Sequence, residues 1–149
     1  MSEHDNIAIV RRMYTDVFDQ QEFDLVDTLV APHFKNHAAP PGMQDGPDGI
    51  KAVVKMLFGA FPDDRHEIED IFAAGDRVAA RVTHHGTHLG PYMGVPPSGK
   101  HVSQAELHII RLEHGQWVEH WGVRDDLGFL HQMQSADPQL AHNAPGLPG

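Results

Sequence analysis

The strongest constraint on the fold is a change in the spacing of apolar residues near Pro62. Before this proline, apolar side chains recur every three or four residues, which is the period of an amphipathic helix. After it, apolar and polar side chains alternate in the segments 66–73, 77–88, 100–112 and 116–124, as in strands with one buried face. Helices followed by a run of strands predict an α+β domain, with helices covering one face of a curved sheet and enclosing a pocket.

Three helices are predicted in the first half of the chain, and prolines end the second and the third. The predicted helices span 7–19, 23–30 and 50–61. Asp5 or Asn6 is expected to cap the first helix, and Pro32 to end the second, because proline is poorly tolerated beyond the first helical turn. On this pattern, the first sixty residues contain helices and loops but no strand.

Short turn sequences connect the predicted strands. AGD at 74–76 and EHG at 113–115 are typical of tight turns, so the strands on either side of each are predicted to form antiparallel hairpins. Asp125 or Asp126 is expected to begin a last short helix. We interpret residues 1–134 as a single domain and residues 135–149, which are rich in Pro, Gly and Ala, as a flexible tail.

The composition excludes several classes of function. The net charge of −10 would repel phosphate backbones and anionic membranes, so neither nucleic acid nor a membrane is expected as a partner. The chain has no cysteine and therefore no disulfide or thiolate metal site. Its start lacks the pattern of a secretory signal, and no apolar run approaches the length that spans a bilayer, so we expect a cytoplasmic protein.

The thirteen histidines raise the question of a metal site. On a strand, His84 and His88 share one face while His85 points to the other. Neither a paired-histidine helical motif nor a fixed spacing of histidine and carboxylate is present. We therefore predict no bound metal and no cofactor.

Two neighbouring strands carry the most suggestive set of ionisable side chains. Alternation places Glu106 and His108 on one face of their strand, and His120 and Gly122 on one face of the next. If the strands pair, a carboxylate and two imidazoles converge, which is what proton transfer in an apolar cavity requires.

The opposite orientation of the same strand is equally open. Leu107 and Ile109 also form a consistent apolar set, which would leave Glu106 and His108 in solvent if it faced the core. On the following strand, Trp117 and Trp121 are expected to point away from His120 and to serve as core or interface residues.

Several segments together resemble a known family. The loop GVPPSGK, the hairpin LHIIRLEHGQWVEHW and the helix entry GPDGI are similar to those of the SnoaL-like polyketide cyclases, or ester cyclases. This family belongs to the superfamily of nuclear transport factor 2 and ketosteroid isomerase. The resemblance, over about residues 5–133, implies a conical, cystatin-like α+β barrel with a deep apolar pocket, commonly dimeric or larger.

The resemblance also implies site residues. Family members of known activity close a polyketide ring by aldol chemistry without metal or cofactor, using an aspartate base assisted by histidines. By this likeness the histidines fall on His108 and His120, the pocket asparagine on Asn36, and the aspartate position on Gly122. Since glycine cannot act as a base, the base is expected to be Glu106, which stands where a cyclase has glutamine.

Other residues are assigned to the pocket with less specific signals. Asp125 is a second candidate for the catalytic carboxylate, although its position also suits a helix N-cap. The remaining candidates for the pocket wall or mouth are His37, Phe58, Phe61, His88 and Met93.

Three functions are consistent with this sequence. The first is acid/base ring closure on a hydrophobic carbonyl or polyketide substrate. The second is oxygen insertion, because some relatives of this family are polyketide hydroxylases. The third is non-catalytic binding of a small molecule, which the loss of the aspartate at Gly122 would allow. A homodimer or homotetramer is expected from the resemblance in each case.

Overall fold

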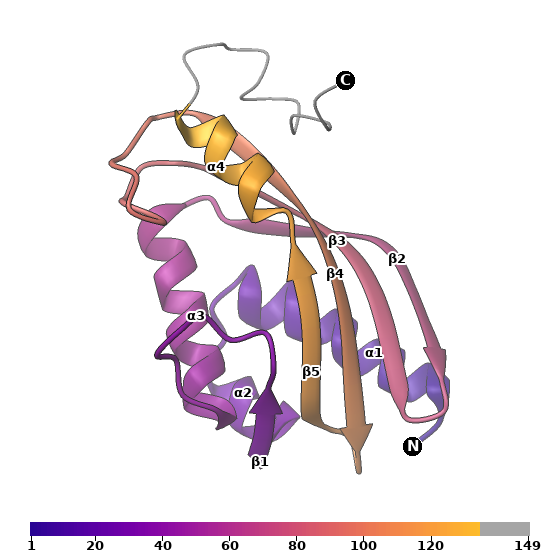
Figure 1. Ribbon diagram of the computed structural model, residues 1–149. Coiled ribbons are helices and arrows are strands. Elements are labelled where there is room, and N and C mark those ends of the chain that lie inside the picture. Colours follow the sequence, from indigo (N-terminus) through magenta and orange to yellow (C-terminus); the bar gives the residue numbers. More distant parts are fainter. Residues whose placement is uncertain (135–149) are drawn as a thin grey trace.

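The computed structural model describes residues 1–134, and the predicted tail at 135–149 lies outside the described residues. The elements are the helices α1 (Glu3–Arg12), η1 (Met13–Phe18), α2 (Asp24–Leu29), α3 (Gly46–Ala60) and α4 (Asp126–Gln134), and the strands β1 (Val30–Asn36), β2 (Arg65–Ala74), β3 (Arg77–Thr87), β4 (His101–Glu113) and β5 (Gln116–Arg124). The predicted α+β class is confirmed: helices lie against one face of a curved sheet (Figure 1).

The first helix begins earlier than predicted. Ser2, not Asp5 or Asn6, is the N-cap: the Ser2 hydroxyl accepts from the backbone N–H of Asp5, whose carboxylate accepts in return from the backbone N–H of Ser2. This capping box starts the helix at Glu3. The helix then widens into the π-helical segment η1, a rare geometry often found at functional sites, and η1 carries Tyr14 toward the sheet.

Strand β1 corrects the prediction that no strand precedes residue 62. The helix α2 ends at Leu29, and the chain then runs as a strand that pairs in parallel with β5. The register between the two strands shifts between Val30 and Lys35, across Pro32, which has no N–H to donate. Proline is normally excluded from sheets, but it is tolerated in an edge strand and at such an irregularity.

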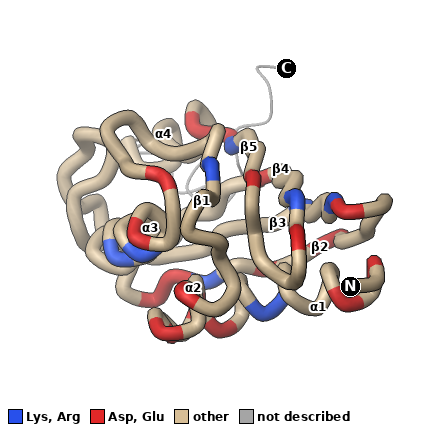
Figure 2. Tube along the Cα trace, turned by 90° about the horizontal axis from the view of Figure 1, so that it is seen from below, with Lys and Arg blue, Asp and Glu red and all other residues tan. Residues whose placement is uncertain are grey.

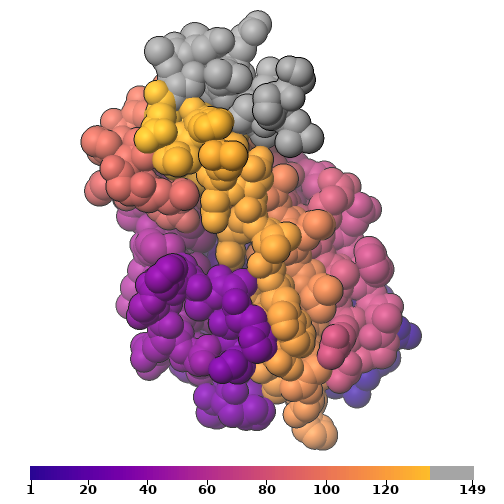
Figure 3. All heavy atoms as spheres, in the orientation of Figure 1, coloured from indigo at the N-terminus to yellow at the C-terminus, as the bar shows by residue number. Residues whose placement is uncertain are grey.

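The sheet has the order β1-β5-β4-β3-β2 and is open, with β1 and β2 at its edges. All neighbours other than β1 and β5 are antiparallel, so both predicted hairpins are confirmed, with turns at Gly75 and at His114–Gly115. The space-filling view shows the segment of β1 lying directly against β5 (Figure 3). A register shift in β2 between Ile68 and Asp70 is an irregularity of the kind that bends a sheet.

An irregularity in β5 reverses the predicted direction of Trp117. Leu112 pairs with Trp117 and Arg111 with Glu119, so one extra residue, Val118, is accommodated in β5. The insertion changes the alternation, and Trp117 is buried on the same inner face as His120 instead of pointing away from it. Trp121 does point away, as predicted, and stacks on His37.

The burial pattern of β4 decides between the two orientations left open by its sequence. Glu106 and His108 are buried at 5% and 4% exposure, whereas Leu107 and Ile109 are 55% and 43% exposed. The polar set therefore faces the helices, and the apolar set lies on the outer face of the sheet. The main core forms where α1 packs on the inner face of β2 and β3 and η1 packs on β2, and α3 closes the other side beside β1 (Figure 1).

Charged residues occur on helices, strands and loops alike. Figure 2 shows acidic and basic residues interspersed along the backbone. Within residues 1–134, no helix combines the length and apolar character needed to cross a membrane.

Candidate functional site

A cavity of about 510 Å³ lies between the helices and the inner face of the sheet. This size suits a drug-sized ligand. Its wall combines apolar side chains with a few ionisable groups and is formed by Tyr14, Phe18, Asn36, Ala38, Ala39, Pro40, Pro41, Ile50, Val53, Met56, Leu57, His66, Pro91, Tyr92, Met93, Gln104, Glu106, His108, Trp117, His120, Arg124 and Asp126.

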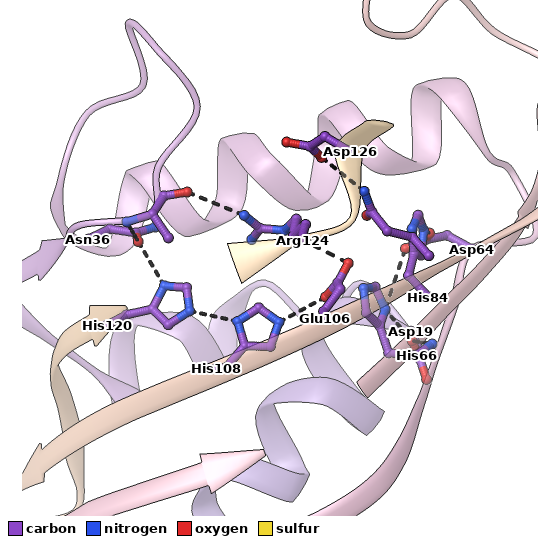
Figure 4. Close-up of polar contacts among 12 residues, drawn as sticks. Asp19, Asn36, Asp64, His66, His84, Glu106, His108, His120, Arg124 and Asp126 are labelled. Carbon is purple, nitrogen blue, oxygen red and sulfur yellow. Dashed lines mark hydrogen bonds and ion pairs between the residues drawn. The ribbon is translucent and has the colours of Figure 1, made fainter. Parts of the chain in front are cut away.

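Three buried side chains and the half-buried Asn36 form one hydrogen-bonded chain on this wall, drawn in Figure 4. Asn36 Oδ1 lies 2.7 Å from His120 Nδ1, His120 Nε2 lies 2.8 Å from His108 Nδ1, and His108 Nε2 lies 2.8 Å from Glu106 Oε1. Alternation on β4 places Glu106 beside His108, and β5 and β1 supply the other two members in turn. The structure therefore brings together four of the residues predicted from the sequence.

The hydrogen bonds fix the tautomer of His120. The backbone N–H of Ala38 donates to Asn36 Oδ1, which identifies that atom as the oxygen of the amide. His120 Nδ1 must then carry the proton that it donates to the same oxygen. Burial, followed by the charges of His108 and Arg124, holds the pKa of His120 well below its ordinary value. His120 is therefore neutral, and its unprotonated Nε2 accepts from His108 Nδ1.

At the other end of this hydrogen-bonded chain, His108 and Glu106 share one proton. Because His108 Nδ1 donates to His120, His108 Nε2 and Glu106 Oε1 can form a hydrogen bond only if a proton lies between them. Burial opposes ionisation of Glu106, but the hydrogen bond and charge of His108 outweigh it and lower the pKa of the carboxyl to about 2. The pair is therefore a carboxylate facing an imidazolium.

Gly122 lies opposite His108 in the β4–β5 register. A Cβ atom at this position would lie 2.8 Å from His108 Nδ1 and 3.1 Å from His120 Nε2, the two atoms of the imidazole–imidazole hydrogen bond. Both distances are too short for an undisturbed contact. Because Gly122 has no side chain, the rings of His108 and His120 have room to form their direct hydrogen bond. Gly122 itself does not line the cavity, but it borders a hollow on the outer face of the sheet.

Sequence reasoning missed two potential hydrogen-bond donors in the cavity wall. Tyr14 is buried against the ring of His108, and burial together with the charge of Glu106 raises the pKa of its phenol, which stays protonated. Arg124 Nε lies 3.8 Å from Glu106 Oε2, and its Nη1 contacts the carbonyl oxygen of Ala38. In the sequence, Tyr14 fits the apolar period of a helix and so cannot be told from a core residue. Arg124 stands at the end of a strand and so cannot be told from a surface residue.

A second buried polar cluster adjoins the cavity. His66 lines it, and the ring of His66 stacks on that of His84 with centroids 4.8 Å apart. His84 Nε2 contacts Asp64 Oδ1, and His66 Nδ1 lies 3.1 Å from Asp19 Oδ1. Burial would lower the pKa of His66, but the hydrogen bond to Asp19 and the nearby carboxylates raise it.

The other predicted catalytic carboxylate occupies a helix end. Asp125 Oδ1 accepts from the backbone N–H of Gly128, so Asp125 caps α4. Its neighbour Asp126 lines the cavity instead and accepts from Gln104 Nε2 (Figure 4).

The remaining predicted pocket residues are spread over several environments. Met93 lines the cavity. Phe58 packs against the main core and Phe61 lies in a second apolar cluster, so neither borders the cavity. His37 bonds to Glu119 and stacks on Trp121 outside the cavity.

His88 also lies outside the cavity. It is fully buried at the start of the loop that connects β3 and β4. His88 Nδ1 accepts from the backbone N–H of Ser98, and its backbone N–H and carbonyl bond to Lys100 and Gly99. These contacts hold the loop in place.

This combination of an α+β fold and a buried histidine–carboxylate chain beside an apolar cavity is typical of domains that bind or transform small molecules. The family of SnoaL-like polyketide cyclases matches residues 8–133, and the chain belongs to this family. Among curated relatives, the aklanonic acid methyl ester cyclase DauD of Streptomyces sp. (strain C5) is 30% identical, over 85% of this chain and 80% of its own.

Solved structures agree with this assignment. IdmH of Streptomyces antibioticus, a candidate polyketide cyclase, is 30% identical with a TM-score of 0.77, over 87% of this chain and 99% of its own. AclR of Streptomyces galilaeus, a candidate hydroxylase, is 26% identical with a TM-score of 0.75, over 91% of this chain and 85% of its own.

Proposed function

We propose that the protein is a polyketide cyclase-type enzyme that performs cofactor-free acid/base chemistry on a hydrophobic carbonyl substrate. The observation that carries this proposal is the hydrogen-bonded chain Asn36–His120–His108–Glu106 on the wall of an apolar cavity. The likeness to an aklanonic acid methyl ester cyclase favours a polyketide ester as the substrate class.

Glu106 would act as the base only after its partner moves. In the resting pair its pKa of about 2 makes it a weak base. A substrate carbonyl oxygen that takes over the hydrogen bond from His108 Nε2 would remove the contact that holds this pKa low. The same exchange polarises the carbonyl and strengthens the base, so binding of the substrate would itself activate the carboxylate.

The proton and electron pair can then be followed through ring closure. Glu106 removes a proton from the carbon next to the carbonyl, and the electron pair of the broken C–H bond moves to the carbonyl oxygen. His108, as imidazolium, stabilises the resulting enolate, and Tyr14 and Arg124 are the neighbouring donors. The enolate carbon attacks a second carbonyl of the same molecule, and the new alkoxide receives the proton from Glu106.

His120 and Asn36 act on this step through His108. With His120 fixed as a neutral acceptor, His108 Nδ1 keeps its proton, and only the Nε2 proton faces Glu106 and the substrate. Asn36 in turn is held by the N–H of Ala38, and Asp45 accepts from the backbone N–H of Asn36.

Hydrogen exchange in heavy water tests the proposal without requiring the final product to be known. The protein is incubated with an anthracycline-type polyketide methyl ester, and deuterium at the carbon next to the carbonyl is followed by mass spectrometry. We expect exchange faster than in the protein-free solution, and a loss of about 100-fold or more in Glu106→Gln.

The matched control is Glu113→Gln, which changes a surface carboxylate on the same strand that pairs with Arg111. Exchange in this variant should equal that of the wild type. Exchange that survives fully in Glu106→Gln contradicts the assignment of the base.

Oxygen insertion is the second candidate, favoured by the likeness to AclR and by the glycine at the aspartate position. Product formation that requires oxygen and a reductant, with no exchange in heavy water, would support it. Binding of the ester without exchange or product under any of these conditions would instead support a non-catalytic accessory role.

We also propose that the chain forms a homodimer or homotetramer through the outer face of the sheet. This face exposes Phe72, Leu107, Ile109 and Val123, which border a hollow of about 410 Å³. Contiguous exposed apolar side chains of this kind mark interaction surfaces. We expect no nucleic acid or membrane partner, in keeping with the acidic net charge of −10.

A further inference from the structure

We propose that Asp64, His66 and His84 form a binding site for one divalent first-row transition-metal ion at the edge of the cavity. Each residue offers one ligand atom, and these atoms all lie within 4.8 Å of one another. The inference goes beyond the proposed acid/base chemistry, which uses none of these three side chains.

The backbone builds this cluster from two adjacent strands. Asp64 precedes β2 by one residue, and alternation places its side chain on the same inner face as that of His66. His66 is the direct register partner of His84 on β3. The side chains are 0–3% exposed, so three potential ligands are held together in the protein interior.

One atom of the cluster lacks the partner that burial demands. Asp64 Oδ2 is buried and has no hydrogen-bond donor within the described residues, and His66 Nδ1 lies 3.7 Å from it. A buried carboxylate oxygen without a donor is costly, and a bound cation removes that cost. This orphaned oxygen distinguishes the cluster from a set of ion pairs that satisfy one another.

The donor pair His66 Nδ1 and Asp64 Oδ2 has nearly the spacing of two ligands of one metal ion. Bonds of about 2.0–2.2 Å in a tetrahedral shell place neighbouring ligand atoms about 3.3–3.6 Å apart. His66 Nδ1 lies 3.7 Å from Asp64 Oδ2 and 3.1 Å from Asp19 Oδ1. His84 Nε2 and Asp64 Oδ1 are in direct contact, so an entering ion would have to part these two atoms.

Asp19 adds a second carboxylate beside the ligands. Its Oδ1 accepts from the backbone N–H of His66 at 2.9 Å, which holds it in place. An imidazole that binds a metal is neutral, so in the occupied site the two carboxylates would balance the charge of a divalent ion. Imidazole and carboxylate donors suit zinc, cobalt or ferrous iron better than magnesium or calcium, which prefer oxygen ligands alone.

Cobalt binding tests the site directly, because Co²⁺ in a nitrogen and oxygen shell gives visible absorption bands. Untagged protein is treated with a chelator, dialysed and titrated with Co²⁺. We expect about one ion per chain, displacement by Zn²⁺ and a rise in melting temperature, since an ion bound only by the folded state stabilises it. No substrate is present, so the outcome is independent of the proposed catalytic function.

Three variants locate the site. Asp64→Asn preserves the shape of the side chain, His84→Ala removes a ligand, and His85→Ala removes the adjacent outward-facing histidine, which pairs with Glu67. We expect the first two to lower the affinity for Co²⁺ by about 100-fold or more and the third to leave it unchanged.

Far-UV circular dichroism establishes that each variant is folded before the titration, and Asp64→Asn keeps the test valid if His84→Ala fails to fold. The proposal is overturned if the folded wild type gives no bands, or if the bands persist in Asp64→Asn with undiminished affinity.

Discussion

The substitution Gly122→Ala tests whether the missing side chain allows the imidazole–imidazole hydrogen bond. The added Cβ would lie 2.8 Å from His108 Nδ1 and 3.1 Å from His120 Nε2, so the two rings must separate. His108 Nδ1 would then lose its acceptor in a buried position.

The expected cost is the sum of three contributions. A buried donor left without a partner costs about 1–3 kcal/mol, and an overpacked interior costs about 1–3 kcal/mol. Alanine recovers about 0.5–1 kcal/mol because it has less backbone freedom to lose than glycine in a strand. We therefore expect a net loss of about 3 kcal/mol in the free energy of unfolding.

Urea denaturation measures this loss as a lower midpoint at an unchanged slope. The control is Gly59→Ala on α3, where no atom lies within 4 Å of the new Cβ. Since alanine is a better helix former, this variant should gain up to about 1 kcal/mol. The reasoning about Gly122 is refuted if Gly122→Ala is as stable as the wild type.

Three other perturbations probe the pocket and the outer face. The carboxylate of Glu106, with its pKa lowered from 4.5 to about 2, stabilises the fold above pH 4.5, and this stabilisation disappears as the pH falls toward 2. In urea denaturation, the free energy of unfolding of the wild type should therefore fall by about 3 kcal/mol more than that of Glu106→Gln between pH 4.5 and pH 2. Equal losses in the two proteins contradict the ion pair. Tyr14→Phe keeps the ring against His108 but removes the hydroxyl, so exchange in heavy water should slow by about 10–100-fold, and an unchanged rate excludes Tyr14 as a donor. Leu107→Arg should reduce the mass found by sedimentation to that of the monomer whereas Leu127→Arg, on α4, should not, and identical masses in both variants contradict the proposed interface.

The α+β class and the four antiparallel strands follow from the sequence because alternation over eight or more residues is a strong local signal. Strand β1 was missed for a local reason: Pro32 reads as the end of a helix, and only its place in an edge strand with a shifted register makes it tolerable. The direction of Trp117 was missed because an extra residue in β5 changes the alternation without a signature in composition.

The two polar clusters differ in how far they could be predicted. Glu106, His108 and His120 lie on one hairpin. The alternation of side chains along each strand and the position of the turn are therefore enough to predict that they converge. The second cluster depends on a contact between Asp19 and His66, which are 47 residues apart in the sequence. Such a contact follows from the packing of η1 on β2, and periodicity along the chain does not contain that information.

The central claim is that one proton is shared between His108 and Glu106 at the end of the hydrogen-bonded chain. Nitrogen-15 NMR of the imidazoles tests this claim most directly. At neutral pH, we predict a neutral His120 with its proton on Nδ1 alone, and a His108 with protons on both nitrogens. His108→Gln and His120→Gln assign the signals. A neutral His108, or a His120 with its proton on Nε2, would contradict the proton arrangement on which the proposed activation of Glu106 depends.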